Sequence, residues 1–172
     1  MGSEMCIRDR TAVVAMAAEY CEADHVTFMA RQARGLVSLA LTEERCEQLN
    51  LPPMVDPATS GAVKLSIEAS TGIDTGISAA DRARTVRVAV APDAKPSDLV
   101  QPGHIFPVAT LTGGVLIRTG AAEAGVDLAT LAGLTPAAVF AEVLDANGDL
   151  ANAAALVAVS YTHLRAHETS PD

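Results

Sequence analysis

Three side chains in the middle of the chain are of types that carry out acid–base or phosphate chemistry. His104 follows Gly103, which lets the backbone turn tightly and present the ring, although a lone histidine after a glycine is commonly a loop residue. Glu142 lies in an apolar run, where a carboxylate either faces outward by strand alternation or is buried and paired. Arg118 precedes a helix start at Gly120, and an arginine beside a helix N-terminus can bind a phosphate.

Two other groups of ligand-type residues are not expected to form a site. Cys6, Cys21 and Cys46 fit neither a disulfide framework nor a Cys-x-x-Cys metal site, and we interpret them as incidental thiols in a reducing cytoplasm. His163 and His167, four residues apart, could pair on a metal, but nothing around them would hold such a site closed. We therefore expect no metal site from either group.

The composition restricts the class of protein and of partner. A chain of 172 residues is long enough for one domain with a core, and because aromatic residues are only 3% of it, that core must be built from small side chains. The formal charge of −9 argues against nucleic acid or an anionic membrane as the main partner, while a small anion needs only a local positive spot. No stretch approaches the roughly 18 apolar residues of a membrane span. We expect a soluble, cytoplasmic protein.

The elements that must position these residues follow from apolar periodicity. The helix at about 24–34 is expected to be capped by Asp24 and ended by Gly35, and two later helices are expected to be capped by Thr42 and by Ser78, with Asp81 completing a box-like start. The remaining expectations are a helix at 121–132 ended by Gly133; strands at 35–41, 62–69, 105–110, 115–118 and 138–144; turns at Pro92, Pro96 and Pro102; and a hairpin turn at Asn147-Gly148.

This irregular alternation, with at least one expected antiparallel pair, predicts an α+β (mixed α/β) fold with a mixed sheet flanked by helices. We assign residues 11–158 to one domain. The ends differ from this middle part: residues 1–10 lack apolar periodicity, and residues 159–172 suddenly concentrate His, Arg and Tyr. Both resemble adapter-like translations at the ends of metagenome-derived reading frames, so we expect them to be non-native segments of a fragment.

Four segments of the chain occur in a fixed order. They are Gly35-Leu36-Val37 through Thr42-Glu43-Glu44-Arg45-Cys46 and Leu51-Pro52-Pro53-Met54-Val55; Ser66-Ile67-Glu68-Ala69 with Thr75-Gly76-Ile77-Ser78-Ala79-Ala80-Asp81-Arg82; Lys95-Pro96-Ser97-Asp98-Leu99 with Pro102-Gly103-His104-Ile105-Phe106-Pro107; and Gly113-Gly114-Val115-Leu116 leading to Glu123-Ala124 and Leu131-Ala132-Gly133. Together they resemble the 3,4-dihydroxy-2-butanone 4-phosphate synthase family of riboflavin biosynthesis, and the resemblance spans most of residues 12–150. A single such string would be only suggestive, whereas four in order leave little room for coincidence.

The resemblance implies a lyase that converts ribulose 5-phosphate into 3,4-dihydroxy-2-butanone 4-phosphate and formate with magnesium, in a homodimer with a mixed α+β fold. Removing a proton beside a ketone and migrating a carbon skeleton develops charge on adjacent oxygens, which a hard dication can stabilise. A general acid or base must also stand within hydrogen-bond reach. The expected partner is a small phosphorylated sugar.

Carried over residue by residue, the resemblance makes His104 and Glu142 catalytic, and Glu142 also substrate-binding. The family's Arg-x-Gly-His-Thr-Glu segment binds the substrate phosphate and the metal, and it matches residues 118–123. Arg118 and the backbone at Gly120 are therefore the expected phosphate-binding groups.

The same match shows where the chain departs from the family. The metal-binding histidine is Ala121 and the phosphate-binding threonine is Ala122, and a methyl group coordinates nothing. The family's acidic loop, Arg-Glu-x-Glu-Gly-Asp, is replaced near Asp9 by a segment that we regard as non-native. Its cysteine after Gly-x-Val is Ser38, and its Asn-Asn-Thr loop reads Asp56-Pro57-Ala58-Thr59. We therefore assign no metal ligand, although magnesium remains the cofactor that the family implies.

Three readings of the chain follow. The first is an active synthase that uses another metal arrangement or a different N-terminus. The second is a weakened or inactive synthase domain from a longer protein, in which a GTP cyclohydrolase II domain follows, as it often does in this family. The third is a sugar-phosphate-binding or structural module that uses Arg118 without turnover. We expect impaired activity because of Ala121 and Ala122.

Overall fold

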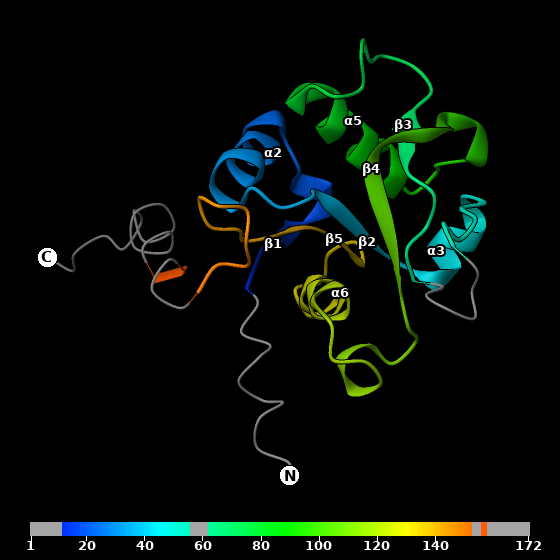
Figure 1. Cartoon of the computed structure of the whole chain (residues 1–172). Helices are drawn as coiled ribbons and strands as arrows, with labels where there is room; N and C mark the ends of the chain where they lie inside the picture. Colours follow the sequence, from blue (N-terminus) through cyan, green and yellow to red (C-terminus); the bar gives the residue numbers. More distant parts are fainter. Residues whose placement is uncertain (1–11, 56–61, 153–155, 158–172) are drawn as a thin grey trace, which may run out of the picture.

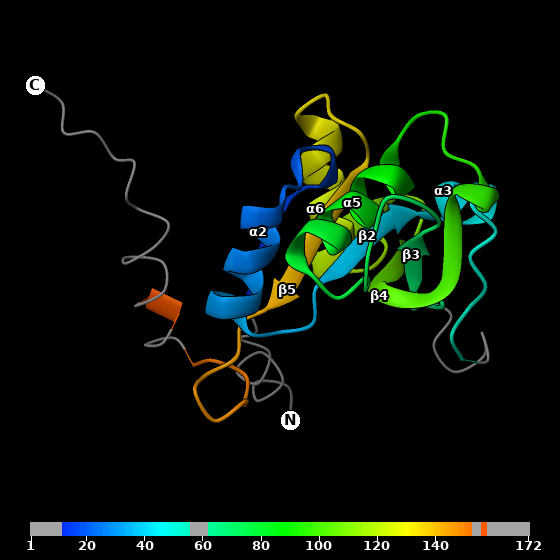
Figure 2. The same ribbon diagram turned by 90° about the horizontal axis from the view of Figure 1, so that it is seen from above.

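The computed structural model describes residues 12–55, 62–152 and 156–157. In these residues a five-stranded sheet of order β1-β5-β2-β4-β3 forms the centre, with α2 and α5 over one face and α6 over the other (Figures 1 and 2). The strands are β1 (Val13–Ala17), β2 (Ser38–Thr42), β3 (Ile67–Ala69), β4 (Leu99–Thr110) and β5 (Ala137–Glu142). The helical segments are η1 (Ala18–Tyr20), α2 (Ala23–Phe28), η2 (Met29–Ala33), α3 (Glu43–Gln48), α5 (Ala79–Val90), η3 (Pro96–Asp98), η4 (Gly114–Leu116) and α6 (Ala121–Leu131).

The sheet is mixed, as the sequence predicts. β2 and β4 are parallel, whereas β5 is antiparallel to both of its neighbours, β1 and β2, and β3 is antiparallel to β4. Helices cover both faces, so the α+β class is confirmed, and so is the expected antiparallel pairing.

The register of the central strands decides which side chains share a face. Ser38 of β2 lies opposite both Phe140 of β5 and Phe106 of β4, so these three side chains point to one face of the sheet. This is the face of α6, because Phe140 packs in one cluster with Ala122 and Val126 of that helix. The face toward α2 and α5 holds the larger core, which Ala, Val and Leu dominate.

Two of the predicted helix starts are confirmed and one is wrong. The hydroxyl of Thr42 accepts from the backbone N–H of Arg45 at 3.2 Å, and that of Ser78 accepts from Asp81 N–H at 3.0 Å. The remaining helix, α2, is capped by Glu22 and not by Asp24. Glu22 forms a reciprocal pair of side-chain and backbone contacts with His25, three residues later.

The end of that helix also differs from the expectation. Arg34, with φ of 66°, takes the left-handed conformation that ends the helix, one residue before the expected Gly35. Gly35 is needed for another reason: a Cβ there would overlap the backbone of Glu142. The strand predicted at 115–118 is wrong as well, because Gly113 and Gly114 both have positive φ and turn the chain into η4.

Four further expectations can be compared with the structure. The strand at 62–69 is regular only at Ile67–Ala69, and its first part makes isolated bridges from Val63 and Lys64. Pro102 lies inside β4 and is not at a turn. Gly133 ends α6 with φ of 73°, and the turn at Asn147-Gly148 closes a narrow hairpin bridged by Leu144 and Leu150, both as predicted.

Asp81 ties the loop before α5 to that helix. Its carboxylate accepts from the backbone N–H groups of Gly76 at 3.0 Å and Asp74 at 3.4 Å. Burial raises the pKa of Asp81, but hydrogen bonds from Ser78, Asp74 and Gly76 outweigh it, and the net pKa lies below the ordinary 3.8. The charged form therefore stabilises the fold above the unfolded-state pKa, and this contribution is lost as the pH falls through the folded-state pKa.

We expect Asp81→Asn to lower the melting temperature at neutral pH, because an amide accepts these hydrogen bonds less strongly than a carboxylate. The difference from the wild type should shrink as the pH is lowered below the ordinary pKa of the group. Thermal unfolding followed by circular dichroism over a pH series measures both effects. A difference that stays constant into the acid range would contradict this role of the Asp81 charge.

Candidate active site

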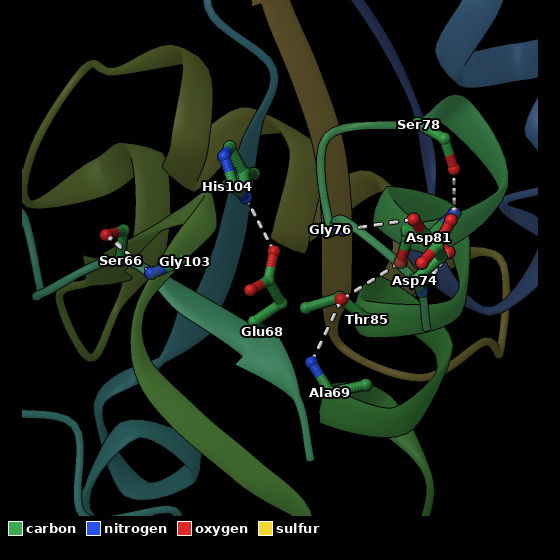
Figure 3. Close-up of polar contacts among 10 residues, drawn as sticks. All are labelled: Ser66, Glu68, Ala69, Asp74, Gly76, Ser78, Asp81, Thr85, Gly103 and His104. Carbon is green, nitrogen blue, oxygen red and sulfur yellow. Dashed lines mark hydrogen bonds and ion pairs between the residues drawn. The ribbon is translucent and has the colours of Figure 1, made fainter. Parts of the chain in front are cut away.

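His104 lies in a bulge of β4. Ile67 pairs with Ile105, but the next residue, Glu68, pairs with Val100, so the four residues from 101 to 104 are extra on the β4 side. Gly103 makes this path possible because a Cβ there would overlap the backbone of Ile67. Its N–H donates to the hydroxyl of Ser66 at 3.1 Å (Figure 3). The glycine before the histidine therefore has a close-packing role that positions the imidazole.

The ring of His104 is paired with a carboxylate that sequence reasoning missed. Nδ1 of His104 lies 2.6 Å from Oε1 of Glu68, and the two side chains are 40% and 15% exposed (Figure 3). Glu68 belongs to the segment Ser66-Ile67-Glu68-Ala69, which served in the sequence only as a scaffold motif. Glu68 lies on the polar face of the strand predicted at 62–69, because side chains alternate along a strand, and this pattern could have identified it as a candidate.

Glu142 is the last residue of β5 and is half-buried. This favours the alternative in which the carboxylate faces outward over the one in which it is buried and paired. It shares the α6 face with Phe140, two residues earlier, while His104 shares that face with Phe106, two residues later. Since β5 and β4 run in opposite directions on either side of β2, His104 and Glu142 lie toward the same end of the sheet. The structure thus brings these two predicted residues to one edge of one face, with Ser38 between them.

Arg118 lies beyond β4, after η4, and its side chain reaches back to the end of that strand. Its Nε donates to Oε1 of Glu123 at 2.7 Å, and its Nη2 donates to the carbonyl of Ala109 at 2.8 Å. Ala109 is five residues beyond His104, or about 17 Å along an extended strand. Within one chain, the structure therefore does not bring Arg118 and His104 together.

The surroundings of Arg118 are suited to an anion. Glu123 is 1% exposed and Arg118 is 36% exposed, so the carboxylate is enclosed while part of the guanidinium reaches the surface. Nη1 has no acceptor among the described residues. Arg118 and Lys64 both line a cavity of about 460 Å³, which Glu43 and the end of β4 complete. Two cations at one cavity can bind a phosphate by charge-assisted hydrogen bonds.

The start of α6 contains the residues that depart from the family. Gly120 is the N-cap without a side-chain cap, and a Cβ there would overlap the Glu123 carboxylate. Ala122 is buried against Phe140 and Val126, and Ala121 packs on the same cluster. Both methyl groups fill apolar space and present no ligand atom.

The described residues contain no cluster of three metal-ligand side chains. Within residues 12–55, 62–152 and 156–157, no three His, Cys, Asp or Glu side chains converge as metal ligands would. Several residues considered in the sequence analysis lie outside the described residues, namely Cys6, Asp9, residues 56–59, His163 and His167. The part of the chain that the structure describes contains no helix long and apolar enough to cross a membrane.

Cys21 and Cys46 are free and buried, which agrees with their interpretation as incidental thiols. Burial raises the pKa of each thiol to about 11. Since the thiolate is the reactive form, neither is poised as a nucleophile.

Curated relatives extend the resemblance seen in the motifs. The chain is 54% identical over 147 residues to the 3,4-dihydroxy-2-butanone 4-phosphate synthase of Pseudomonas syringae pv. tomato, covering 84% of this chain and 40% of that protein. It is 47% identical to the riboflavin biosynthesis protein RibBA of Aquifex aeolicus, covering 91% and 40%. A synthase of Shewanella loihica is 43% identical, with 91% and 73% covered. The chain thus spans about 40% of the length of the first two relatives.

Solved structures agree with these relatives. RibBX, a two-domain 3,4-dihydroxy-2-butanone 4-phosphate synthase from A. baumannii, superposes with a TM-score of 0.84 at 48% identity, covering 91% of this chain and 47% of that one. A synthase in complex with two magnesium ions gives 0.78 at 38% identity, with 90% and 78% covered. The sequence model of the 3,4-dihydroxy-2-butanone 4-phosphate synthase family matches residues 5–166. The chain therefore belongs to the 3,4-dihydroxy-2-butanone 4-phosphate synthase family.

Proposed function

We propose that this chain acts on ribulose 5-phosphate in riboflavin biosynthesis, forming 3,4-dihydroxy-2-butanone 4-phosphate and formate at a rate far below that of its relatives. Family membership supports the reaction. The observation that carries the reduced rate is the first turn of α6, where Ala121 and Ala122 pack into an apolar cluster at the positions of the family's histidine and threonine. The proposal includes a cytoplasmic homodimer.

Arg118 is the proposed phosphate-binding residue. Its Nε and Nη2 are held by Glu123 and the carbonyl of Ala109, which fixes the plane of the guanidinium. The edge carrying Nη1 can then receive phosphate oxygens without a further loss of side-chain freedom. The backbone N–H groups after Gly120, at the start of the 11-residue helix α6, add donors and the positive end of the helix dipole.

His104 and Glu142 are the proposed catalytic residues, and Glu142 also binds substrate. The reaction begins with removal of a proton from a carbon beside a ketone, and a histidine is suited to accept that proton near neutral pH. Because Nδ1 of His104 contacts Glu68, Nε2 is the nitrogen left for substrate. Glu142, toward the same end and on the same face, can accept a hydrogen bond from a sugar hydroxyl.

The family's dependence on magnesium explains the expected loss of rate. A related solved structure holds two magnesium ions, whereas Ala121 supplies no ligand and no three potential ligand side chains cluster among the described residues. The oxygens that become charged during the reaction then lack the stabilisation that a dication would give them.

A second candidate function is a catalytically inactive sugar-phosphate-binding or structural domain of a longer bifunctional riboflavin protein. It is supported by the share of 40% that the chain covers in the riboflavin biosynthesis protein RibBA of Aquifex aeolicus. Such a domain would retain the Arg118 cavity and lose turnover. Binding without formate release distinguishes it from a slow enzyme.

We expect ribulose 5-phosphate to bind in the millimolar range and formate to be released slowly with magnesium present. Calorimetry measures binding, and a coupled formate assay measures turnover. Arg118→Ala should abolish both, whereas Arg87→Ala, at an exposed ion pair far from the cavity in sequence, should change neither. Formate release at the rate of an intact family member would refute the impairment, and absence of binding would refute the phosphate site.

A further inference from the structure

Glu68 lies behind the imidazole of His104 and is more enclosed than the ring that it contacts. The carboxylate is on β3, beside the bulge of β4, and 36 residues separate the pair in sequence. At 2.6 Å the contact between Nδ1 and Oε1 has the length of a strong, charge-assisted hydrogen bond. An ionised carboxylate can only accept, so the proton of this hydrogen bond is carried by Nδ1.

The carboxylate of Glu68 is itself held in place. Gly76, with φ of 78°, lies against it so closely that a Cβ would overlap Oε1. The N–H of Gly76 is anchored by the Asp81 carboxylate at 3.0 Å, and Asp81 sits in the first turn of α5 (Figure 3). The loop that contains Gly76 is thus anchored to α5 and packs against one side of the Glu68 carboxylate, while His104 contacts the other side.

We propose that Glu68 is a positioning residue that holds His104 with its proton on Nδ1 and presents Nε2 to the substrate. This proposal rests on the proposed function for its catalytic consequence, but its chemical content concerns the state of the ring alone. Fixing one nitrogen of a histidine by a hydrogen bond sets both the tautomer and the ring orientation. Gly76 and Asp81 act in turn on Glu68 and not on the ring.

The chain provides an internal reference for the opposite tautomer. Nδ1 of His25 accepts from the backbone N–H of Glu22 at 3.1 Å, so a neutral His25 carries its proton on Nε2. Nitrogen-15 spectra of the imidazoles distinguish the two forms directly. His104 and His25 should therefore give opposite patterns in one sample at about pH 9, where an ordinary histidine is neutral.

The test compares the intact chain with Glu68→Gln, which keeps the shape of the side chain but can donate as well as accept. His104→Asn identifies the signals of His104. We expect a protonated Nδ1 on His104 in the wild type and a mixture of tautomers in Glu68→Gln. Formate release should fall about tenfold to a hundredfold in kcat with KM little changed. Glu68→Asp, which retains the charge, should restore part of the protonation at Nδ1.

Glu22→Gln is the matched control, because the imidazole of His25 is bonded to the backbone N–H of Glu22 and not to the Glu22 carboxylate. It should leave both tautomers unchanged. An unprotonated Nδ1 on His104 in the wild type, or a pattern unaffected by Glu68→Gln in a folded variant, overturns the proposal. A changed tautomer with undiminished formate release overturns the positioning role and also removes His104 from the proposed mechanism. The tautomer of His104 can be measured even in a chain without any turnover. Failure of the proposed function is therefore distinguishable from failure of this proposal.

Discussion

Replacing Ala121 by histidine and Ala122 by threonine, together with the family's acidic loop before Ala15, should raise the rate of formate release by roughly a hundredfold or more. Stabilisation of developing charge by a metal ion is worth several kcal/mol, and each 1.36 kcal/mol is tenfold in rate. The new imidazole would stand at the first residue of α6, where Ala121 is only partly buried and has room to change. Formate production with and without magnesium measures the gain, which should require the metal.

A histidine at Ala132 is the matched control, because this exposed residue caps the other end of the same helix. It adds the same side chain without a site, so the rate should not change. Ala122→Thr enlarges a buried position against Phe140, and we expect it to lower stability by about 1 kcal/mol or somewhat more. If the combined variant folds and the rate stays at that of the parent chain, the loss of ligands at α6 is not the cause of impairment.

Glu123→Ala should lower the free energy of unfolding by about 2–4 kcal/mol, the largest stability effect that we expect from one polar substitution. The carboxylate is enclosed and accepts from Nε of Arg118 at 2.7 Å and from the N–H of Leu111 at 3.4 Å. Its removal leaves the Arg118 charge without its partner and Gly120 without the group that it packs against. Denaturant unfolding followed by circular dichroism gives the difference.

Arg87→Ala is the comparison for an exposed ion pair, since Arg87 and Glu22 are 44% and 60% exposed. That change should cost less than about 1 kcal/mol. Removing both partners in Glu123→Leu with Arg118→Met should cost less than Arg118→Ala alone, because Arg118→Ala leaves the enclosed Glu123 carboxylate unpaired. Equal losses for Glu123→Ala and Arg87→Ala would show that the enclosed pair does not stabilise the fold.

Much of the local structure could be predicted from short stretches of sequence. Thr42 and Ser78 cap their helices as expected, and Gly133 ends α6. These features depend on hydrogen bonds and dihedral angles within a few residues, so the neighbouring residues are sufficient to specify them. One prediction was wrong because two local signals competed: Glu22 and Asp24 are both acceptable caps, and the contact with His25 selected Glu22.

The family, the mixed fold and the departures at Ala121 and Ala122 were determined by the sequence itself, because they depend on which residues occur and in what order. The pairing of His104 with Glu68 and the enclosure of Glu123 beside Arg118 were decided by the tertiary structure. Glu68 reaches His104 only because a bulge shifts the register between β3 and β4, and Gly76 lies on Glu68 only because α5 anchors its loop. Contacts of this kind depend on strand register and helix packing, which join residues far apart along the chain and leave no local pattern from which to predict them.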